Sequence, residues 1–357
     1  MQNKGILISD AHIKSRLWTN FPQIQGDAYQ ALSQIQGEQG KSDFIISCGD
    51  LFDSNRPSST DLEAVSNLMR SVECFYYING NHDDVVPSIV PSLGTNAVHL
   101  GTVPVKINEV PVFGIDYCNN KDLLIEALSE VASELPLIDS SIRPVLILHQ
   151  SLDVFFMSFT ITLQEIRDIL GRPCDIFVGD IHDRKTIESS QGFCQSPGPL
   201  VPQDIGQAKK QQAATWVDFS SGTHVEISDL FIKVRNYHFL ESPDELDKTY
   251  AWCTKVGKYT YLPNVIVLKA DASYKIPARY KDDNIIYILD TTAESIKKEA
   301  VVKATASSLE EAVKAEAAAS GGDTVEILTK LLIKLMHSEV PDEVLLELLK
   351  KWKVVMV

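Results

Sequence analysis

Short runs of consecutive apolar residues alternate with stretches of helical periodicity through the first half of this 357-residue chain. The runs are GILIS (5–9), FIISC (44–48), CFYYI (74–78), VPVFGI (110–115), VLIL (145–148) and DIFVG (175–179). Between them, residues 61–72 and 122–135 carry apolar positions at the spacing of an amphipathic helix. Strands that are apolar on both faces and alternate with helices are typical of a sheet covered on both sides. The pattern therefore predicts an α/β layered domain.

The pattern changes after about residue 190, where polar segments interrupted by Gly and Pro replace this alternation. Further β structure is expected at 214–220, 223–239 and 264–270, and the chain becomes rich in Ala, Glu and Lys from about 292. We therefore expect a layered α/β domain followed by a smaller α+β domain and a helical tail. The expected boundaries are 1–235 for the first domain, 236–305 for a capping domain, and 306–357 for a linker and a C-terminal helical pair.

The tail carries start signals for two helices. Asp323 and Glu326 have the spacing of a capping box, and Pro341 stands where a second helix would begin. Each stretch has an apolar stripe along one face, so it needs a surface to cover. The pair is either a helical hairpin packed on its own domain or a module that docks on a partner.

The composition is that of a folded protein with an excess of acidic side chains. Apolar residues make up 44% and charged residues 23% of the chain, and the net charge is −15. This charge argues against a large surface that binds nucleic acid by charge alone. The six cysteines are scattered without a Cys-x-x-Cys pair, and no apolar run reaches the length of a membrane span. We expect a soluble cytoplasmic protein with reduced thiols.

Side chains of metal-binding types follow five of the apolar runs. They are Asp10 and His12 after the first run, Asp50 after the second, Asn81, His82 and Asp83 after the third, His149 after the fifth, and Asp180 and His182 after the sixth. Alone, each place has an ordinary explanation as a turn, a helix cap or a buried histidine. Open α/β sheets bind ligands at the carboxyl ends of their strands, so five such places together predict one shared metal site. Residues i and i+2 of an extended segment face the same side, which would pair the two ligands after the first run and the two after the sixth.

The residue types limit the metal and the reaction. Carboxylates, imidazoles and an amide oxygen without a thiolate suit manganese, iron or zinc rather than a structural Cys-rich zinc site. There are more ligands than one ion needs, which indicates two ions bridged by a shared carboxylate. Such a pair binds a phosphate, lowers the pKa of a bound water and stabilises a leaving oxygen. The predicted chemistry is therefore phosphoester hydrolysis.

With these motifs the sequence resembles the calcineurin-like metallophosphoesterases, whose signature is Asp-x-His, Gly-Asp, Gly-Asn-His-Asp/Glu, His and Gly-His-x-His. Within that family it is most similar to the SbcD-type nucleases of double-strand-break repair. The similarity covers roughly residues 1–240 and rests on GDLFDSNRPS (49–58), GNHD (80–83), QSPGPLVPQDIG (195–206) and RNYHF (235–239). It implies a DNA exonuclease or endonuclease with two divalent ions, Mn²⁺ first and Mg²⁺, Fe²⁺ or Zn²⁺ as alternatives.

The resemblance also implies a role for each motif residue. The first ion would be held by Asp10, His12, Asp50 and His182, and the second by Asp50, Asn81, His149 and Asp180. Asp50 would bridge the two ions, and Asn81 would also position the scissile phosphate. His82 would be the catalytic acid that is not a ligand, and Asp83 would orient it through a hydrogen bond.

One residue departs from the family pattern, because Asp180 stands where the family has His. Two divalent ions carry +4, and the carboxylates of Asp10, Asp50 and Asp180 bring −3, which leaves about +1 instead of about +2. We expect a harder site for the second ion and weaker Lewis acidity.

By the same resemblance, the partners are DNA and an SbcC-type coiled-coil ATPase, with the helical pair at 323–357 as the docking segment. A homodimer through residues 61–72 is expected, unless that helix only covers the sheet. The candidates for DNA contact are the capping domain and the side chains of Lys14, Arg16, Arg56, Arg184 and Lys185, with Lys14 and Arg56 placed first. Two other functions stay open. The same motifs would serve hydrolysis of small phosphoesters or cyclic nucleotides, and a non-catalytic scaffold would keep the fold.

Overall fold

The computed structural model describes residues 3–18, 20–83, 88–155, 159–255, 262–270 and 273–291. The predicted helical pair in 306–357 and the end of the predicted capping domain lie outside the described residues. The chain divides into two compact units, each described here by itself. The first comprises Met1–Tyr237, Trp252–Val265 and Asp283–Ile286, and the second includes His238–Ala251 and Ile266–Asp282.

Two six-stranded sheets form the frame of the first unit. The first sheet has, in spatial order, β14 (Glu226–Ile232), β13 (Gln212–Asp218), β1 (Lys4–Ile8), β4 (Phe44–Cys48), β5 (Cys74–Ile78) and β6 (Ala97–His99). The second has β11 (Lys185–Ile187), β12 (Cys194–Ser196), β10 (Asp175–Gly179), β9 (Val145–His149), β8 (Val110–Ile115) and β7 (Val105–Ile107). A separate hairpin pairs β2 (Arg16–Trp18) with β3 (Phe21–Gln25).

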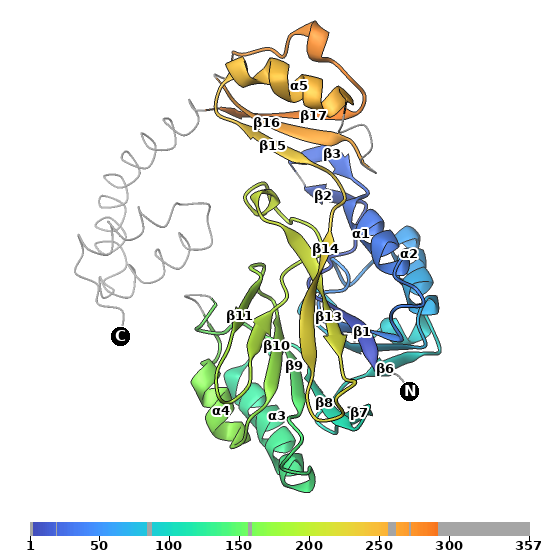
Figure 1. Ribbon diagram of the computed structural model, residues 1–357, viewed down its shortest axis with the longest axis vertical. Coiled ribbons are helices and arrows are strands. Elements are labelled where there is room, and N and C mark those ends of the chain that lie inside the picture. Colours follow the sequence, from blue (N-terminus) through green and yellow to red (C-terminus); the bar gives the residue numbers. More distant parts are fainter. Residues whose placement is uncertain are drawn as a thin grey trace, which may run out of the picture. The chain divides into compact units, whose positions relative to one another are not determined.

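The two sheets pack face to face between two layers of helices. Buried side chains from both sheets make the central core: Leu7, Phe44, Ile46 and Ile78 from the first, and Val112, Ile147 and Phe177 from the second. Alternate residues of the second sheet face α3 (Lys121–Glu134) and α4 (Leu163–Leu170), which bury Leu128 and Ile166 there. Figure 1 shows α1 (Asp27–Gln36) and α2 (Ser59–Arg70) on the side of the first sheet that faces away from the second. The predicted α/β layered domain is confirmed.

Side-chain caps define where two of these helices begin. Ser58 accepts a hydrogen bond from the backbone N–H of Asp61, whose carboxylate accepts one from the N–H of Ser58, so α2 starts with a capping box. Thr162 and Glu165 do the same for α4. The helix predicted over 61–72 is therefore shifted toward its polar cap at residue 58.

Strands β1, β4 and β5 of the first sheet run parallel to one another, and so do β8, β9 and β10 of the second. All of them except β8 precede a metal-binding motif. The register places Cys48 opposite Ile78 in the first sheet and Gly179 opposite His149 in the second. The loops that follow these strands therefore begin at the same edge of each sheet.

The three-stranded sheet beyond residue 236 has the order β15 (Tyr237–Leu240), β16 (Asn264–Ala270) and β17 (Ile285–Thr291). Figure 1 shows α5 (Leu246–Lys255) along one face of this sheet. The part has the α+β composition predicted for a capping domain, whereas the boundaries at 236 and 306 stay predictions. None of the helices within the described residues is both long and apolar enough to span a membrane.

Candidate metal centre

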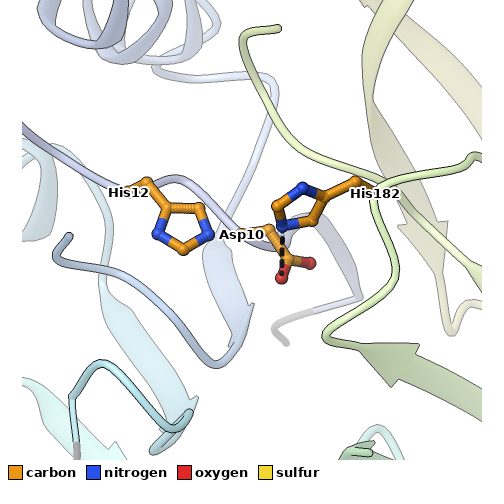
Figure 2. A group of neighbouring side chains, drawn as sticks. All are labelled: Asp10, His12 and His182. Carbon is orange, nitrogen blue, oxygen red and sulfur yellow. Dashed lines mark ion pairs between the residues drawn. The ribbon is translucent and has the colours of Figure 1, made fainter. Parts of the chain in front are cut away.

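Ligand atoms from both sheets of the first unit meet in three overlapping groups. The groups are Asp10, His12 and His182; His12, Asp50 and His82; and Asp10, Asp50 and His149. Within each group the ligand atoms lie within 4.8 Å of one another. Figure 2 shows the rings of His12 and His182, which come from segments far apart in the sequence, beside the carboxylate of Asp10. Six residues predicted from separate strand ends therefore lie together.

Asp50 lies at the centre of this arrangement. Its Oδ2 atom is 3.6 Å from His12 Nε2, 3.5 Å from His149 Nε2 and 3.9 Å from His82 Nε2. The side chain is buried. A buried carboxylate oxygen that three imidazoles approach suits a position between two ions, which is the bridging place expected for Asp50.

The surroundings of His12 fit a metal ligand. Both of its ring nitrogens are buried and have no hydrogen-bond partner within the described chain. Leaving a buried polar atom without a partner costs about 1–3 kcal/mol, so such atoms call for an explanation. Burial lowers the pKa of His12 to about 3 and outweighs the opposing charge of Asp50, so the ring is neutral at pH 7. A neutral imidazole with both nitrogens unsatisfied is ready to coordinate a cation.

His149 holds a proton that a metal ion would have to displace. Its Nδ1 faces the carbonyl of Cys48 at 2.8 Å, and its Nε2 faces Asn81 Oδ1 at 3.1 Å, so both ring nitrogens point at acceptors. Burial lowers the pKa of His149, but the hydrogen bond with Asp50 and the charges of Asp10 and Asp50 outweigh it and raise this pKa to about 10. In the metal-free protein the ring is therefore an imidazolium beside two carboxylates.

We expect metal binding to release protons and to tighten with rising pH. Because the pKa of His149 lies near 10, its proton is present at neutral pH and must leave when Nε2 coordinates an ion. The apparent affinity of one Mn²⁺ should rise by up to about tenfold per pH unit between pH 6 and 8, and level off near the pKa. Calorimetric titration in buffers of different ionisation enthalpy measures the protons released. An affinity independent of pH, with no proton release, would contradict this assignment.

The ligand-bearing loops owe their course to left-handed backbone at four predicted ligands. Asp10, His12, Asp50 and Asp180 have φ of 47°, 42°, 49° and 75°, whereas two other non-glycine residues in the described chain, both in the turn between β7 and β8, have positive φ. We expected extended backbone for Asp10 with His12 and for Asp180 with His182, and this expectation is wrong. Their convergence comes from tight turns, and strain of this kind concentrates at functional sites.

Three glycines let these turns approach each other closely. A Cβ on Gly49, which has φ of 91°, would lie 2.4 Å from His149 Nδ1. A Cβ on Gly80 would lie 2.2 Å from Asp50 Oδ1, and one on Gly179 would lie 2.3 Å from the carbonyl oxygen of Cys48. Since no side chain fits there, glycine is required for backbone segments of the two sheets to meet at the site.

His82 is oriented by the backbone and not by Asp83. The Nδ1 atom of His82 lies 2.8 Å from the carbonyl oxygen of Asp53, so it carries the hydrogen and leaves Nε2 on the side of Asp50. The carboxylate of Asp83 accepts hydrogen bonds from the backbone N–H groups of Leu51 and Phe52, at 2.7 and 2.8 Å. The expected hydrogen bond from His82 to the carboxylate of Asp83 is therefore wrong: Asp83 fastens the loop that carries Asp50.

The carboxylate of Asp180 has a hydrogen-bond partner outside the three groups of ligand atoms. The backbone N–H of Asp180 donates to Asp10 Oδ1 at 3.1 Å, but its carboxylate accepts the hydroxyl of Ser151 at 2.7 Å and belongs to none of the three groups. Asn81 Oδ1 lies beside His149, as a shared ligand site would need. The role of Asp180 as a ligand stays a prediction.

The basic side chains predicted to contact DNA differ in whether they already have partners within the chain. Arg56 is exposed, whereas Lys14 Nζ pairs with Asp53 Oδ1 at 2.7 Å. Arg184 binds Asp229 and the carbonyl of Pro197, which occupies its guanidinium within the fold. Residues that the sequence did not single out, namely Asp53, Ser151 and Gln207, each contact a motif side chain or its loop.

Comparison with known proteins finds a similar family over the first part of the chain. Residues 6–170 match the model of the calcineurin-like phosphoesterases. Two relatives described as DNA double-strand break repair protein Mre11 are 24% identical over 208 residues (Methanosarcina mazei) and 22% identical over 219 residues (Methanosarcina acetivorans). The matches cover 56% and 58% of this chain but 33% and 35% of the relatives, so the chain spans about a third of their length.

A solved structure, TT1561 of Thermus thermophilus, aligns with 64% of this chain and 99% of that chain at 10% identity and a TM-score of 0.44. The family model covers three of the strand-end motifs in the first sheet and His149 in the second. Members of the family use a pair of divalent metal ions, and the grouped carboxylates and histidines are the candidate ligands here. Over residues 6–170 the chain is therefore similar to the calcineurin-like phosphoesterases, and this match supports a metal-dependent phosphoester hydrolase.

Proposed function

We propose that this chain is a DNA nuclease that hydrolyses phosphodiester bonds as an exonuclease or endonuclease in a repair or recombination complex. The observation that carries the proposal is the buried carboxylate of Asp50 between histidines, with the ring of His82 beside it and 40% exposed. Two relatives described as double-strand break repair proteins support DNA as the substrate. The length of chain beyond the matched phosphoesterase model favours a large substrate over a small phosphoester.

The proposed ligands of the first ion are Asp10, His12, Asp50 and His182, and those of the second are Asp50, Asn81 and His149, with Asp180 as a further candidate. Mn²⁺ is the proposed metal, because this donor set contains oxygen and imidazole ligands without thiolate. Bound ions would supply positive charge to the phosphate oxygens and would lower the pKa of water, so that hydroxide is available to attack phosphorus. Asn81 would hold the scissile phosphate.

Protonation of the leaving sugar oxygen falls to His82. Its Nδ1 is engaged by the carbonyl of Asp53, so Nε2 is the nitrogen that exchanges the proton. Asp10, Asp50 and His149 are buried, whereas His82 is substantially exposed, and it therefore lies where a substrate arrives from solvent. Asp83 acts indirectly, by holding the backbone next to Asp50.

The proposal extends to three partners. An SbcC-type ATPase would bind the C-terminal helical segment, which lies outside the described residues, and DNA would contact Arg56 and Lys14. A homodimer would use the exposed side of α2, because its residues Val65, Leu68 and Met69 are buried in their own unit. Sedimentation of the purified chain, alone and with duplex DNA, tests the last two contacts.

Digestion of end-labelled duplex DNA in Mn²⁺, with EDTA as the metal-free control, tests the function. We expect cleavage of DNA in Mn²⁺ and little hydrolysis of bis(p-nitrophenyl) phosphate under the same conditions. Rapid hydrolysis of the small diester without DNA cleavage would instead support the phosphodiesterase alternative. Absence of bound metal by mass spectrometry and of both activities would support a non-catalytic scaffold.

A further inference from the structure

A second polar cluster lies at the carboxyl ends of strands next to the metal centre. His99 ends β6, Asp116 directly follows β8, and Asn79 directly follows β5. Strands β5 and β6 are parallel neighbours in the first sheet, with Tyr77 opposite His99, whereas β8 belongs to the second sheet. The cluster therefore joins the two sheets at the edge where the motif loops begin.

Asp116 is the acceptor that holds this cluster together. Its Oδ1 accepts the backbone N–H of Asn79 at 2.7 Å, and its Oδ2 accepts the side-chain amide of Asn79 at 3.2 Å. The Nε2 atom of His99 lies 2.9 and 3.0 Å from the same two oxygens. The backbone N–H of Tyr117 also donates to the carbonyl of Asn79, at 2.9 Å. Three hydrogen bonds thus tie residue 79 to the segment that follows β8.

These contacts bear on the metal centre because Asn79 is close in the chain to a proposed ligand. It comes two residues before Asn81, and the Oδ1 atom of Asn81 lies 3.1 Å from Nε2 of His149. Asn81 extends from the first sheet, whereas His149 ends β9, the parallel neighbour of β8 in the second sheet. The distance between two proposed ligands of one ion therefore depends on how the end of β5 is held against the end of β8.

His99 orients the acceptor. Asp116 and His99 are 38% and 44% exposed, so neither is forced into this contact by burial in the core. The hydrogen bond with Asp116 raises the pKa of His99. With its ring nitrogen between both carboxylate oxygens, His99 leaves Asp116 two directions in which to accept from Asn79.

We propose that Asp116, oriented by His99, is a positioning residue that sets Asn81 against His149 and so controls binding of the second metal ion. The proposal rests on the assignment of Asn81 and His149 as ligands under the proposed function. Partners that orient ligands typically change metal affinity by about ten- to hundredfold when they are removed. If Asp116 had a purely structural role, its removal would instead lower the stability of the fold and change the affinity of both metal-binding steps to the same extent.

Calorimetric titration of the full chain with Mn²⁺ tests the proposal. For Asp116→Ala and Asp116→Asn we expect one of two binding steps to weaken by about ten- to hundredfold, with the other within about threefold of wild type. His99→Gln should weaken the same step less, because Asp116 keeps its bonds to Asn79. His224→Gln is the matched control, since His224 also faces an acid, Glu226, but lies in the turn after β13, toward the opposite edge of the first sheet.

Thermal unfolding of the metal-free variants separates positioning from folding. If Asp116→Ala does not fold, the nearly isosteric Asp116→Asn carries the test. The proposal would be overturned if a folded Asp116→Asn variant bound both Mn²⁺ ions with the affinities of wild type. It would also be overturned if the affinities of both steps fell to the same extent. A wild-type chain that binds two Mn²⁺ but cuts no DNA would overturn the nuclease function alone, because metal binding is measured without DNA.

Discussion

His82→Ala is expected to slow DNA cleavage by about 10²- to 10⁴-fold while two Mn²⁺ remain bound to each chain. The expectation follows from where the two ring nitrogens lie. Nδ1 is held at 2.8 Å by the carbonyl of Asp53, and Nε2 points toward Asp50 Oδ2 at 3.9 Å. Removing the ring takes away a proton donor to the leaving oxygen, while the proposed ligands keep their positions.

Single-turnover cleavage of duplex DNA in Mn²⁺ measures this effect apart from product release, and calorimetry counts the bound ions. His224→Ala is a suitable control, because this histidine lies in the turn between β13 and β14. A substrate with a better leaving group, such as a nitrophenyl ester of a nucleotide, should narrow the difference between His82→Ala and wild type. A variant that lost its metal ions would instead identify His82 as a ligand, and one with wild-type cleavage would exclude it as the acid.

The layered fold follows from features that one sequence carries locally. Runs such as FIISC and DIFVG are short, apolar on nearly every residue and bounded by polar turns, and the structure has strands at 44–48 and 175–179. Parallel strands of this kind place their carboxyl ends on one edge. A histidine or aspartate immediately after such a strand is therefore placed in space before any long-range contact is known. This is why nine motif residues could be grouped in advance, six of which belong to the three groups of ligand atoms.

The details of the site depend on contacts between distant segments, which periodicity does not encode. Asp83 was expected to orient His82, but it caps two backbone N–H groups about thirty residues earlier in the chain, and the carbonyl of Asp53 takes the expected role. The left-handed backbone at Asp10 and Asp50 was likewise invisible, because neither residue type requires it. Positive φ at these positions is stabilised by the surrounding fold and not by local propensity.

The net charge at the site also depends on a contact that the sequence does not reveal, because Asp180 replaces the His of the family pattern. Its sequence position implied a third carboxylate on the ions, whereas the carboxylate accepts the Ser151 hydroxyl and only the backbone N–H contacts Asp10. If that hydrogen bond persists when metal binds, the ligand charge is −2 and not −3. The net positive charge over the phosphate then approaches that expected for a site with His at this position.

Asp50→Asn is expected to remove at least one of two bound Mn²⁺ and to reduce DNA cleavage by more than about 10³-fold. Bridging two cations needs the charge of a carboxylate, and Asp50 Oδ2 is the oxygen approached by three imidazoles. The substitution is nearly isosteric, and an amide oxygen can still accept the backbone N–H of His82, which Asp50 Oδ1 accepts at 2.8 Å. The loss should therefore lie in metal binding and not in the shape of the loop.

Thermal unfolding with and without Mn²⁺ makes the distinction measurable. A ligand that binds the folded state alone raises its stability by about 2.7 kcal/mol at a hundred times its dissociation constant, so wild type should unfold at a higher temperature in Mn²⁺. Asp50→Asn should lose most of that increase while its metal-free unfolding temperature stays near that of wild type. Asp229→Asn removes a half-exposed carboxylate paired with Arg184, and it should keep the full increase in unfolding temperature caused by Mn²⁺. An Asp50→Asn variant with two ions and the full increase would place the bridge on another residue, and Asp10, whose carboxylate belongs to two of the three groups, would be the first to examine.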